Sequence, residues 1–122
     1  MTSDLSLYLN VWVPPNATST SNLPVKVWIY GGGEQGGGTQ NPLYDGCSLA
    51  AHETLVVSIA YRVGTLGFLT LASAGIAGNF GIQDLVLGLE WVQSHIAAFG
   101  GNPVSFPTLF YYPLETILNI PQ

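Results

Sequence analysis

The sequence is poor in charged residues, above all in basic ones. Asp, Glu, Lys and Arg make up 7% of its 122 residues, against roughly 25% in an average soluble domain. Lys26 and Arg62 are the only basic residues beside seven acids, which gives a formal net charge of −5. Two basic side chains cannot neutralise a run of phosphates, so the composition argues against nucleic-acid binding. Because 48% of the residues are hydrophobic, we expect this chain to be one small domain, or a piece of a larger core.

Cysteine is almost absent, and so is any pattern typical of a membrane or export segment. With Cys47 as the single cysteine, no disulfide can form within the chain, and a structural zinc site lacks ligands. No basic region followed by an apolar stretch opens the sequence, so we expect no signal peptide in it. Residues 63–83 carry no charge but include five glycines, which favours a loop in a packed domain over a membrane-spanning helix.

One short motif concerns modification. Asn16-Ala17-Thr18 matches the acceptor pattern for N-glycosylation. The pattern has meaning only if the protein is secreted, and the sequence leaves the compartment open.

Three strand-like runs and one long helix organise the chain. Residues 7–13, 25–30 and 55–60 favour extended backbone, and the third run is apolar on both faces, as in a buried parallel strand. Apolar residues then recur at three- and four-residue steps, which predicts a helix with one broad apolar face. Its apolar positions are Ile82, Leu85, Val86, Leu89, Val92, Ile96 and Phe99. We expect Asn79 to cap this helix and Gly100-Gly101 to end it, within an α/β fold that has a partly parallel sheet.

The most unusual stretch is "WIYGGGEQGGG", residues 28–38. A flexible linker is one interpretation, but the stretch directly follows a buried strand. A phosphate loop would end in Gly-Lys-Ser/Thr, whereas Gly38-Thr39-Gln40 stands here. The dinucleotide spacing G-x-G-x-x-G fits residues 31–36, but no helix pattern opens there. The remaining interpretation is an oxyanion hole, in which backbone N–H groups after a strand stabilise a tetrahedral intermediate.

Five segments in one order resemble a known family: "LYLNVWVP", "LPVKVWIYGGG", "YDGCSLAA", "VVSIAYRVGTLGFL" and "GNFGIQDLVLGLEWVQSHIAAFGGNP". From about residue 3 to Pro103 the chain resembles the type-B carboxylesterases, which include the cholinesterases. The resemblance implies part of an α/β-hydrolase fold and hydrolysis of a small-molecule carboxylic ester through a serine acyl-enzyme, without a cofactor. It also implies that Gly32 and Gly33 are the oxyanion-hole donors and that Gly31 shapes the turn.

The resemblance assigns structural roles to further residues. Arg62 in "YRVG" and Asp84 in "GNFGIQD" match a family ion pair, and a buried arginine is tolerated when it is paired. Trp91 and Phe99 match core positions of the family helix. Three residues depart from the family pattern: Ser6 replaces a cysteine, Leu85 replaces a glutamine, and Glu34 replaces an aromatic residue. A carboxylate at Glu34 would repel a developing oxyanion unless it points to solvent.

The catalytic nucleophile of the family has no counterpart in this sequence. After "FGGNP" the family continues into Gly-x-Ser-x-Gly, whereas this chain reads "VSFPTLFYYPLETILNIPQ". Ser73 in "LASAG" is a decoy, because Leu71 occupies the position where the nucleophile turn needs a small residue. His52 and His95 have no acidic partner at a suggestive spacing, so we interpret both as surface residues.

We therefore expect two regions: residues 1–103, an N-terminal part of a carboxylesterase domain, and residues 104–122, a non-family tail. Val104-Ser105 and Gln122 can be encoded by intron-boundary codons, so the tail could be translated intron. The complete protein from which this chain would come is expected to be an esterase, whether or not it is secreted. This chain alone is expected to be inactive. The alternatives are a non-enzymatic binding or adhesion protein, or an unstable product without function; an open sheet edge argues against a stable binding module.

Overall fold

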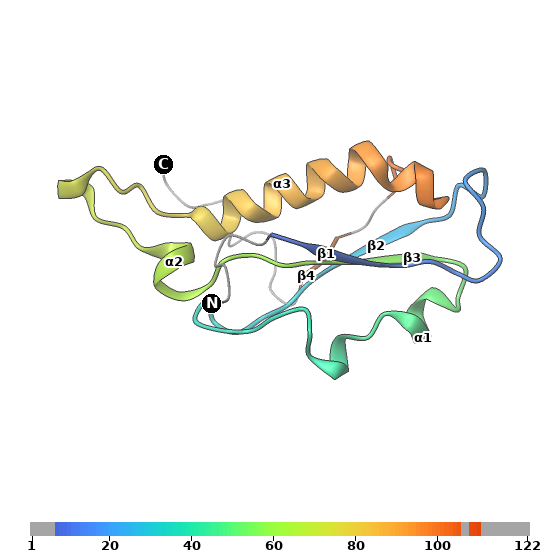
Figure 1. Ribbon diagram of the computed structural model, residues 1–122, viewed down its shortest axis with the longest axis horizontal. Helices are drawn as coiled ribbons and strands as arrows, with labels where there is room; N and C mark the ends of the chain where they lie inside the picture. Colours follow the sequence, from blue (N-terminus) through green and yellow to red (C-terminus); the bar gives the residue numbers. More distant parts are fainter. Residues whose placement is uncertain (1–6, 106–107, 111–122) are drawn as a thin grey trace.

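The computed structural model describes residues 7–105 and 108–110 (Figure 1). Ser6, Pro107 and the tail from residue 111 onward, on which several expectations rest, lie outside the described residues. The strands are β1 (Leu9–Trp12), β2 (Val25–Ile29), β3 (Leu55–Ile59) and β4 (Thr108–Phe110). The α-helices are α1 (Cys47–Ala50), α2 (Gly64–Phe68) and α3 (Phe80–His95), and the 3₁₀ helices are η1 (Pro42–Tyr44), η2 (Ala72–Ala74) and η3 (Ile96–Phe99).

The four strands form one mixed sheet in the order β1-β3-β2-β4. β2 runs parallel to both β3 and β4, and β1 pairs with β3 in the antiparallel direction. All five residues of β3 are buried, because this strand has neighbours on both sides and is covered on both faces. The expected three strands and the partly parallel sheet are therefore confirmed.

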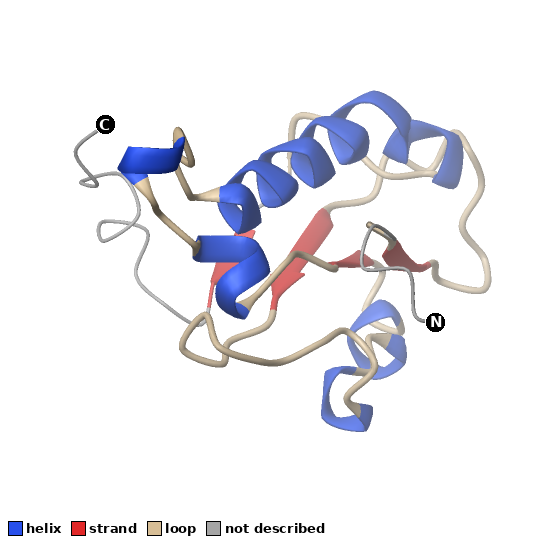
Figure 2. Cartoon of the chain, turned by 60° about the vertical axis from the view of Figure 1, so that its left-hand side comes forward, coloured by secondary structure: helices blue, strands red, loops and turns tan. Residues whose placement is uncertain are grey.

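Helices cover the two faces of this sheet unequally. The long α3 lies along one face, and the short α1 lies on the other (Figures 1 and 2). The core between α3 and the sheet is built from aliphatic side chains of β2, β3 and the helix, which are Val25, Val27, Ile29, Leu55, Val57, Ile59, Leu85, Val92 and Ile96. This core holds α3 against the strands and fixes where the loops at their ends begin.

The predicted long helix is present, but two details of the expectation are wrong. Val86 is 50% exposed, because successive residues on an α-helix point about 100° apart and only one stripe can face the sheet. Phe99 is 39% exposed and lies beyond the end of α3, in η3. Asn79 stands at the expected cap position, but it is in the left-handed conformation with φ 58° and its side chain makes no capping hydrogen bond. Its carbonyl oxygen instead accepts from the Gln83 N–H at 3.1 Å.

The parallel strands bring their carboxyl ends to one edge of the sheet. The loop that follows β2 and the segment between β3 and α2 both leave from this edge (Figure 1). In open α/β sheets this is the edge where ligands bind. Within the described part of the chain, no helix is both long and apolar enough to cross a membrane.

Candidate functional site

The glycine-rich loop begins directly after β2 and folds into a tight turn. The Gln35 N–H donates to the Gly32 carbonyl oxygen at 3.2 Å, and the two central residues, Gly33 and Glu34, have φ values of 60° and 63°. Positive φ at both central positions defines a type I′ turn. Gly33 adopts this backbone without steric cost, whereas Glu34 carries a Cβ in the left-handed region.

Gly32 is required by a second feature of the loop, a close approach of backbone to backbone. Its φ is 154°, and a Cβ placed on it would overlap the carbonyl oxygen of Gly36. The loop can therefore fold back on itself only because residue 32 is a glycine and has no side chain.

The N–H groups of Gly32 and Gly33 have no hydrogen-bond partner within the described part of the chain. Among the hydrogen bonds of the described residues, neither N–H donates to a protein acceptor, and both residues are exposed. Free backbone N–H groups on consecutive residues at a turn are the donors from which anion and oxyanion sites are built.

Two tyrosines, which sequence analysis overlooked, hold the start of this loop. Tyr30 follows β2 and Tyr61 follows β3; their rings stack with centroids 4.5 Å apart. The Tyr30 hydroxyl donates to the Tyr61 carbonyl oxygen at 2.9 Å, and the Tyr61 hydroxyl donates to the Tyr30 carbonyl oxygen at 2.7 Å. The signal in the sequence was an aromatic residue just after each of two parallel strands, whose ends must be neighbours.

Arg62 and Asp84 lie in direct contact at the same edge of the sheet. The guanidinium donates from Nε to Asp84 Oδ2 and from the second amino group to Oδ1, both at 2.7 Å. The Arg62 backbone N–H also donates to Oδ2, at 3.0 Å. The guanidinium lies 5.5 Å from the centroid of the Phe80 ring. The pair thereby ties the segment after β3 to the N-terminal part of α3.

The two members of this pair differ in burial. The Asp84 side chain is 3% exposed, whereas the Arg62 side chain is 32% exposed. The expectation of a buried arginine is therefore wrong, because the carboxylate is the buried partner. Burial alone would raise the pKa of Asp84, but hydrogen bonds from the Arg62 side chain and backbone outweigh it and lower that pKa. The carboxylate therefore stays ionised in the folded chain at neutral pH.

Burial likewise governs the tyrosine pair. Loss of hydration raises the pKa of Tyr61 to about 12, with smaller contributions from Tyr30, Glu34 and Tyr44. It also raises the pKa of Tyr30, against the opposing effect of the hydrogen bond with the Tyr61 backbone. Both phenols are therefore neutral donors at physiological pH, and neither serves as a base.

Glu34 is exposed in the turn, and its carbonyl oxygen accepts from the Gly64 N–H. This hydrogen bond connects the glycine loop to the start of α2. A carboxylate that points to solvent repels a developing oxyanion less than a buried one does. The residue thus adds a hydrated negative charge beside Gly32 and Gly33, and not a buried one.

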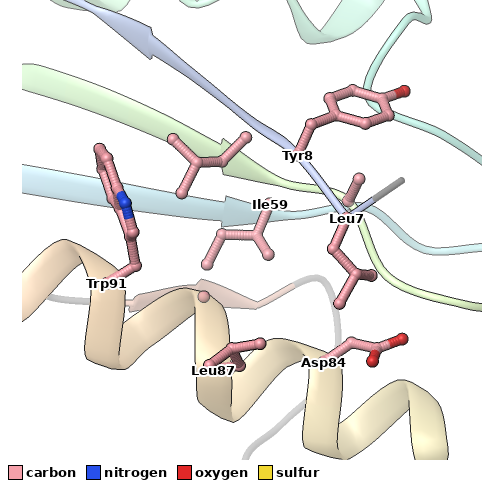
Figure 3. A pocket seen from close by; sticks show the side chains of 9 residues that line it. Leu7, Tyr8, Ile59, Asp84, Leu87 and Trp91 are labelled. Atoms are coloured by element: carbon pink, nitrogen blue, oxygen red, sulfur yellow. The ribbon is translucent and has the colours of Figure 1, made fainter. Parts of the chain in front are cut away.

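Two hollows adjoin these elements. One, of about 260 Å³, is lined by Tyr30, Gly37, Gly38, Tyr61 and Leu66 among others and lies beside the glycine loop. The other, of about 360 Å³, lies between β1, β3 and α3. Figure 3 shows Leu7, Ile59 and Leu87 around it, Asp84 at one end and Tyr8 pointing away from the helix. Since its one carboxylate is already paired with Arg62, this second hollow offers apolar contact and no reactive group.

Ser73, His52 and His95 form no catalytic arrangement among the described residues. Ser73 is exposed in η2, His52 is exposed after α1, and His95 stacks on Trp91 with ring centroids 4.9 Å apart. Across residues 7–105 and 108–110 no hydrogen bond joins a serine to a histidine, and no group of three or more His, Cys, Asp or Glu residues could hold a metal ion. The expectation that the nucleophile lies outside this sequence stays a prediction.

Comparisons with known proteins agree on one family. The sequence model described as the carboxylesterase family matches residues 2–109. Cholinesterase of Mus musculus is 52% identical over 110 residues, which is 88% of this chain and 18% of that relative. Bile salt-activated lipase of Mus musculus is 48% identical over 105 residues, 80% of this chain and 18% of the relative. A solved PNB esterase superposes with a TM-score of 0.77 and 44% identity, covering 84% of this chain and 22% of its own.

The chain therefore spans about a fifth of the length of these relatives. The family match continues to residue 109, six residues beyond the boundary expected at residue 103. Its last residues include Thr108 and Leu109 of β4, which pairs with β2. The boundary at 103 and the translated-intron hypothesis for residues 104–122 stay predictions.

Proposed function

Because the chain belongs to the carboxylesterase family and its sheet is part of an α/β-hydrolase fold, we propose that it forms part of an enzyme that hydrolyses carboxylic esters. The relatives matched along most of the chain carry the names of ester hydrolases, which favours catalysis over the binding or adhesion alternative. The substrate of the complete enzyme would be a small-molecule carboxylic ester, handled without a cofactor.

The contribution of this chain is the oxyanion hole. Gly32 and Gly33 would donate their N–H groups to the oxygen that becomes negative when a nucleophile attacks the ester carbonyl. The observation that carries this proposal is that both glycines are exposed in a turn after a parallel strand, and that neither N–H group has an acceptor among the residues the structure describes. Gly31 would connect that turn to Tyr30, whose hydrogen bonds with Tyr61 limit its movement.

The nucleophile would come from another part of the enzyme. A serine would attack the carbonyl carbon, form a tetrahedral intermediate, release the alcohol and leave an acyl-enzyme that water then hydrolyses. The two glycine N–H groups would stabilise the negative oxygen in both halves of this reaction. The pair of Arg62 and Asp84 would act only on the architecture, by holding α3 to the end of β3.

A chimeric esterase tests the proposal. In it, residues 7–105 replace the aligned segment of the 44%-identical PNB esterase, and hydrolysis of an aryl ester is measured. We expect Gly33→Ala to lower kcat on the order of 10²-fold, because a Cβ at φ 60° shifts the turn and its N–H groups.

Gly75→Ala is the matched control. Gly75 has φ 72°, and a Cβ on it meets nothing within 4 Å, as at Gly33. The two substitutions therefore impose the same backbone strain, but only one lies in the proposed oxyanion loop. Equal kcat values for the two variants, with both chimeras folded by circular dichroism, would rule out the proposed role of the loop.

A further inference from the structure

We propose that Asn16 is the acceptor of an N-linked glycan when the chain is carried into the secretory pathway. It lies in the connection between β1 and β2, and Asn16-Ala17-Thr18 is the only Asn-X-Ser/Thr triplet in the sequence. The family function assigns nothing to this connection, and the inference is independent of the proposed oxyanion hole. The ligand is an oligosaccharide joined through its reducing sugar.

The backbone at Asn16 presents its side chain to solvent. The Ala17 N–H donates to the Pro14 carbonyl oxygen at 3.0 Å, which closes a tight turn with Pro15 and Asn16 at its centre. Asn16 is exposed, whereas Pro14 is buried and anchors the base of the turn. An asparagine amide on an exposed turn can carry a bulky, hydrated glycan without displacing core residues.

The third residue of the triplet is also at the surface. Thr18 is exposed, and its hydroxyl lies 3.1 Å from the Thr20 hydroxyl and 3.2 Å from that of Ser21. The Thr18 N–H donates to Ser21 Oγ at 2.8 Å. This small uncharged polar cluster keeps the connection compact, so a glycan on Asn16 would stand on an ordered base.

The position leaves the glycine loop unobstructed. Trp12 pairs with Val56 and Val25 pairs with Leu55, so the connection from β1 to β2 lies where β2 begins. The glycine loop lies where β2 ends, five residues later, which corresponds to roughly 16 Å along an extended strand. Figure 1 shows the two connections at opposite ends of the sheet.

The chemistry is a transfer from a lipid-diphosphate-linked oligosaccharide, catalysed by a membrane-bound transferase. Asn16 Nδ2 forms a bond to the anomeric carbon of the first sugar, and the bond from that carbon to the diphosphate oxygen breaks. Nδ2 loses one proton, and the lipid diphosphate leaves with the bonding electrons. No oxidant or reductant takes part.

The test is secretion of residues 1–122 from eukaryotic cells behind a cleavable signal, followed by intact-mass measurement. We expect one glycan, released under native conditions by peptide-N-glycosidase, which converts the asparagine to aspartate. Thr18→Ala should abolish the modification, whereas Thr18→Ser should retain it. Because the transfer acts on the nascent chain, the result does not depend on how stably the secreted chain folds.

A control variant shows whether the chain reached the transferase. Asn16→Gln combined with Pro24→Thr removes the natural triplet and creates a new acceptor triplet that begins at Asn22, in the same connection. An unmodified natural chain beside a modified control variant would overturn the proposal. A glycan on Asn16 that the glycosidase releases only after denaturation would contradict the exposed turn.

Discussion

Tyr30 and Tyr61 each donate a phenolic hydrogen bond to the carbonyl oxygen of the other residue, at 2.9 Å and 2.7 Å. The Tyr61 N–H also donates to the Tyr30 hydroxyl oxygen, at 3.3 Å. Each phenol thereby holds the backbone that carries the other, at the ends of two neighbouring parallel strands. The first peptide of the glycine loop is thus fixed by side chains outside the loop.

We expect the tyrosine pair to contribute to stability unequally. In the chimeric esterase, Tyr61→Phe removes one hydrogen bond, which corresponds to about 1 kcal/mol, and Tyr30→Phe removes a donor and an acceptor, about 2 kcal/mol. Midpoints of urea unfolding measure the loss. Tyr8→Phe is the control, because Tyr8 is exposed and, among the described residues, its hydroxyl makes one hydrogen bond, with Gln40 Nε2 at 3.3 Å; an equal shift in all three variants would contradict the assignment.

The same pair makes stability fall at alkaline pH. A tyrosine in an unfolded chain has a pKa near 10, and the pKa of Tyr61 is raised to about 12 in the folded chain. The unfolded state therefore loses this proton first, so the stabilisation is complete below about pH 10 and declines as pH rises toward 12. Because the pKa of Tyr30 is also raised, absorbance titration of the tyrosinates should show late ionisations, and Tyr61→Phe should remove one of them; a titration unaffected by that substitution would contradict the prediction.

The ionisation of Asp84 should make the stability of the fold decrease at acidic pH. Its pKa is lowered in the folded chain, whereas an unfolded aspartate titrates near 3.9. The unfolded state therefore binds the proton first, so the stabilisation is present above about pH 4 and is lost as pH falls through the folded pKa. In urea unfolding of the chimera, Asp84→Asn should lose about 2 kcal/mol at pH 7 and lack this part of the acid dependence.

Arg62→Lys provides the comparison for that variant. Lysine keeps the positive charge but cannot form the two-point contact of a guanidinium with a carboxylate. We expect an intermediate loss of stability and a retained acid dependence. If Arg62→Lys matched the unsubstituted chimera, the geometry of the contact would contribute nothing beyond its charge.

Glu34 combines backbone strain with charge, and two substitutions separate them. Glu34→Gly removes the Cβ at φ 63° and should stabilise the chimera by about 1 kcal/mol. Glu34→Gln keeps the strain, so its stability should not change. Removal of the negative charge near the proposed oxyanion should raise kcat by about two- to fivefold in both variants. An increase of kcat in Glu34→Gly alone would assign the effect to the turn.

The isolated chain should not catalyse ester hydrolysis. Ser73 is exposed in η2, and in the described part of the chain it has no histidine partner. We expect purified residues 1–122 to hydrolyse an aryl ester no faster than a denatured sample, and Ser73→Ala to change nothing. A reproducible turnover that Ser73→Ala abolishes would overturn this expectation.

Elements whose causes are local could be predicted from the sequence. The runs at 25–30 and 55–60 became β2 and β3 because valine, isoleucine and aromatic residues, which favour extended backbone, make up most of both strands. The helix was found from its periodicity, but its exact stripe was not, since Val86 is exposed and Leu85 is buried. Which apolar residues face inward depends on how the helix lies on the sheet, and periodicity alone does not fix that rotation.

Features that depend on tertiary pairing could not be predicted in the same way. The reciprocal bonds of Tyr30 and Tyr61 exist because β2 and β3 are parallel neighbours, whereas the residues are 31 positions apart in sequence. The positive φ of Glu34 was also missed, because glutamate has no preference for that conformation and the surrounding turn imposes it. The ion pair of Arg62 and Asp84 entered through a resemblance to a family and not through the pattern of charges.

The strand order has one further consequence for how a complete hydrolase could be assembled. β2 lies between β3 and β4, and its last residue, Ile29, is paired with Phe110. Adjacent strands are about 4.8 Å apart, so a chain leaving β4 departs one strand spacing from the start of the glycine loop. A reactive serine at that exit would face the loop with no domain closure, and the distance between the two would be set by the sheet alone.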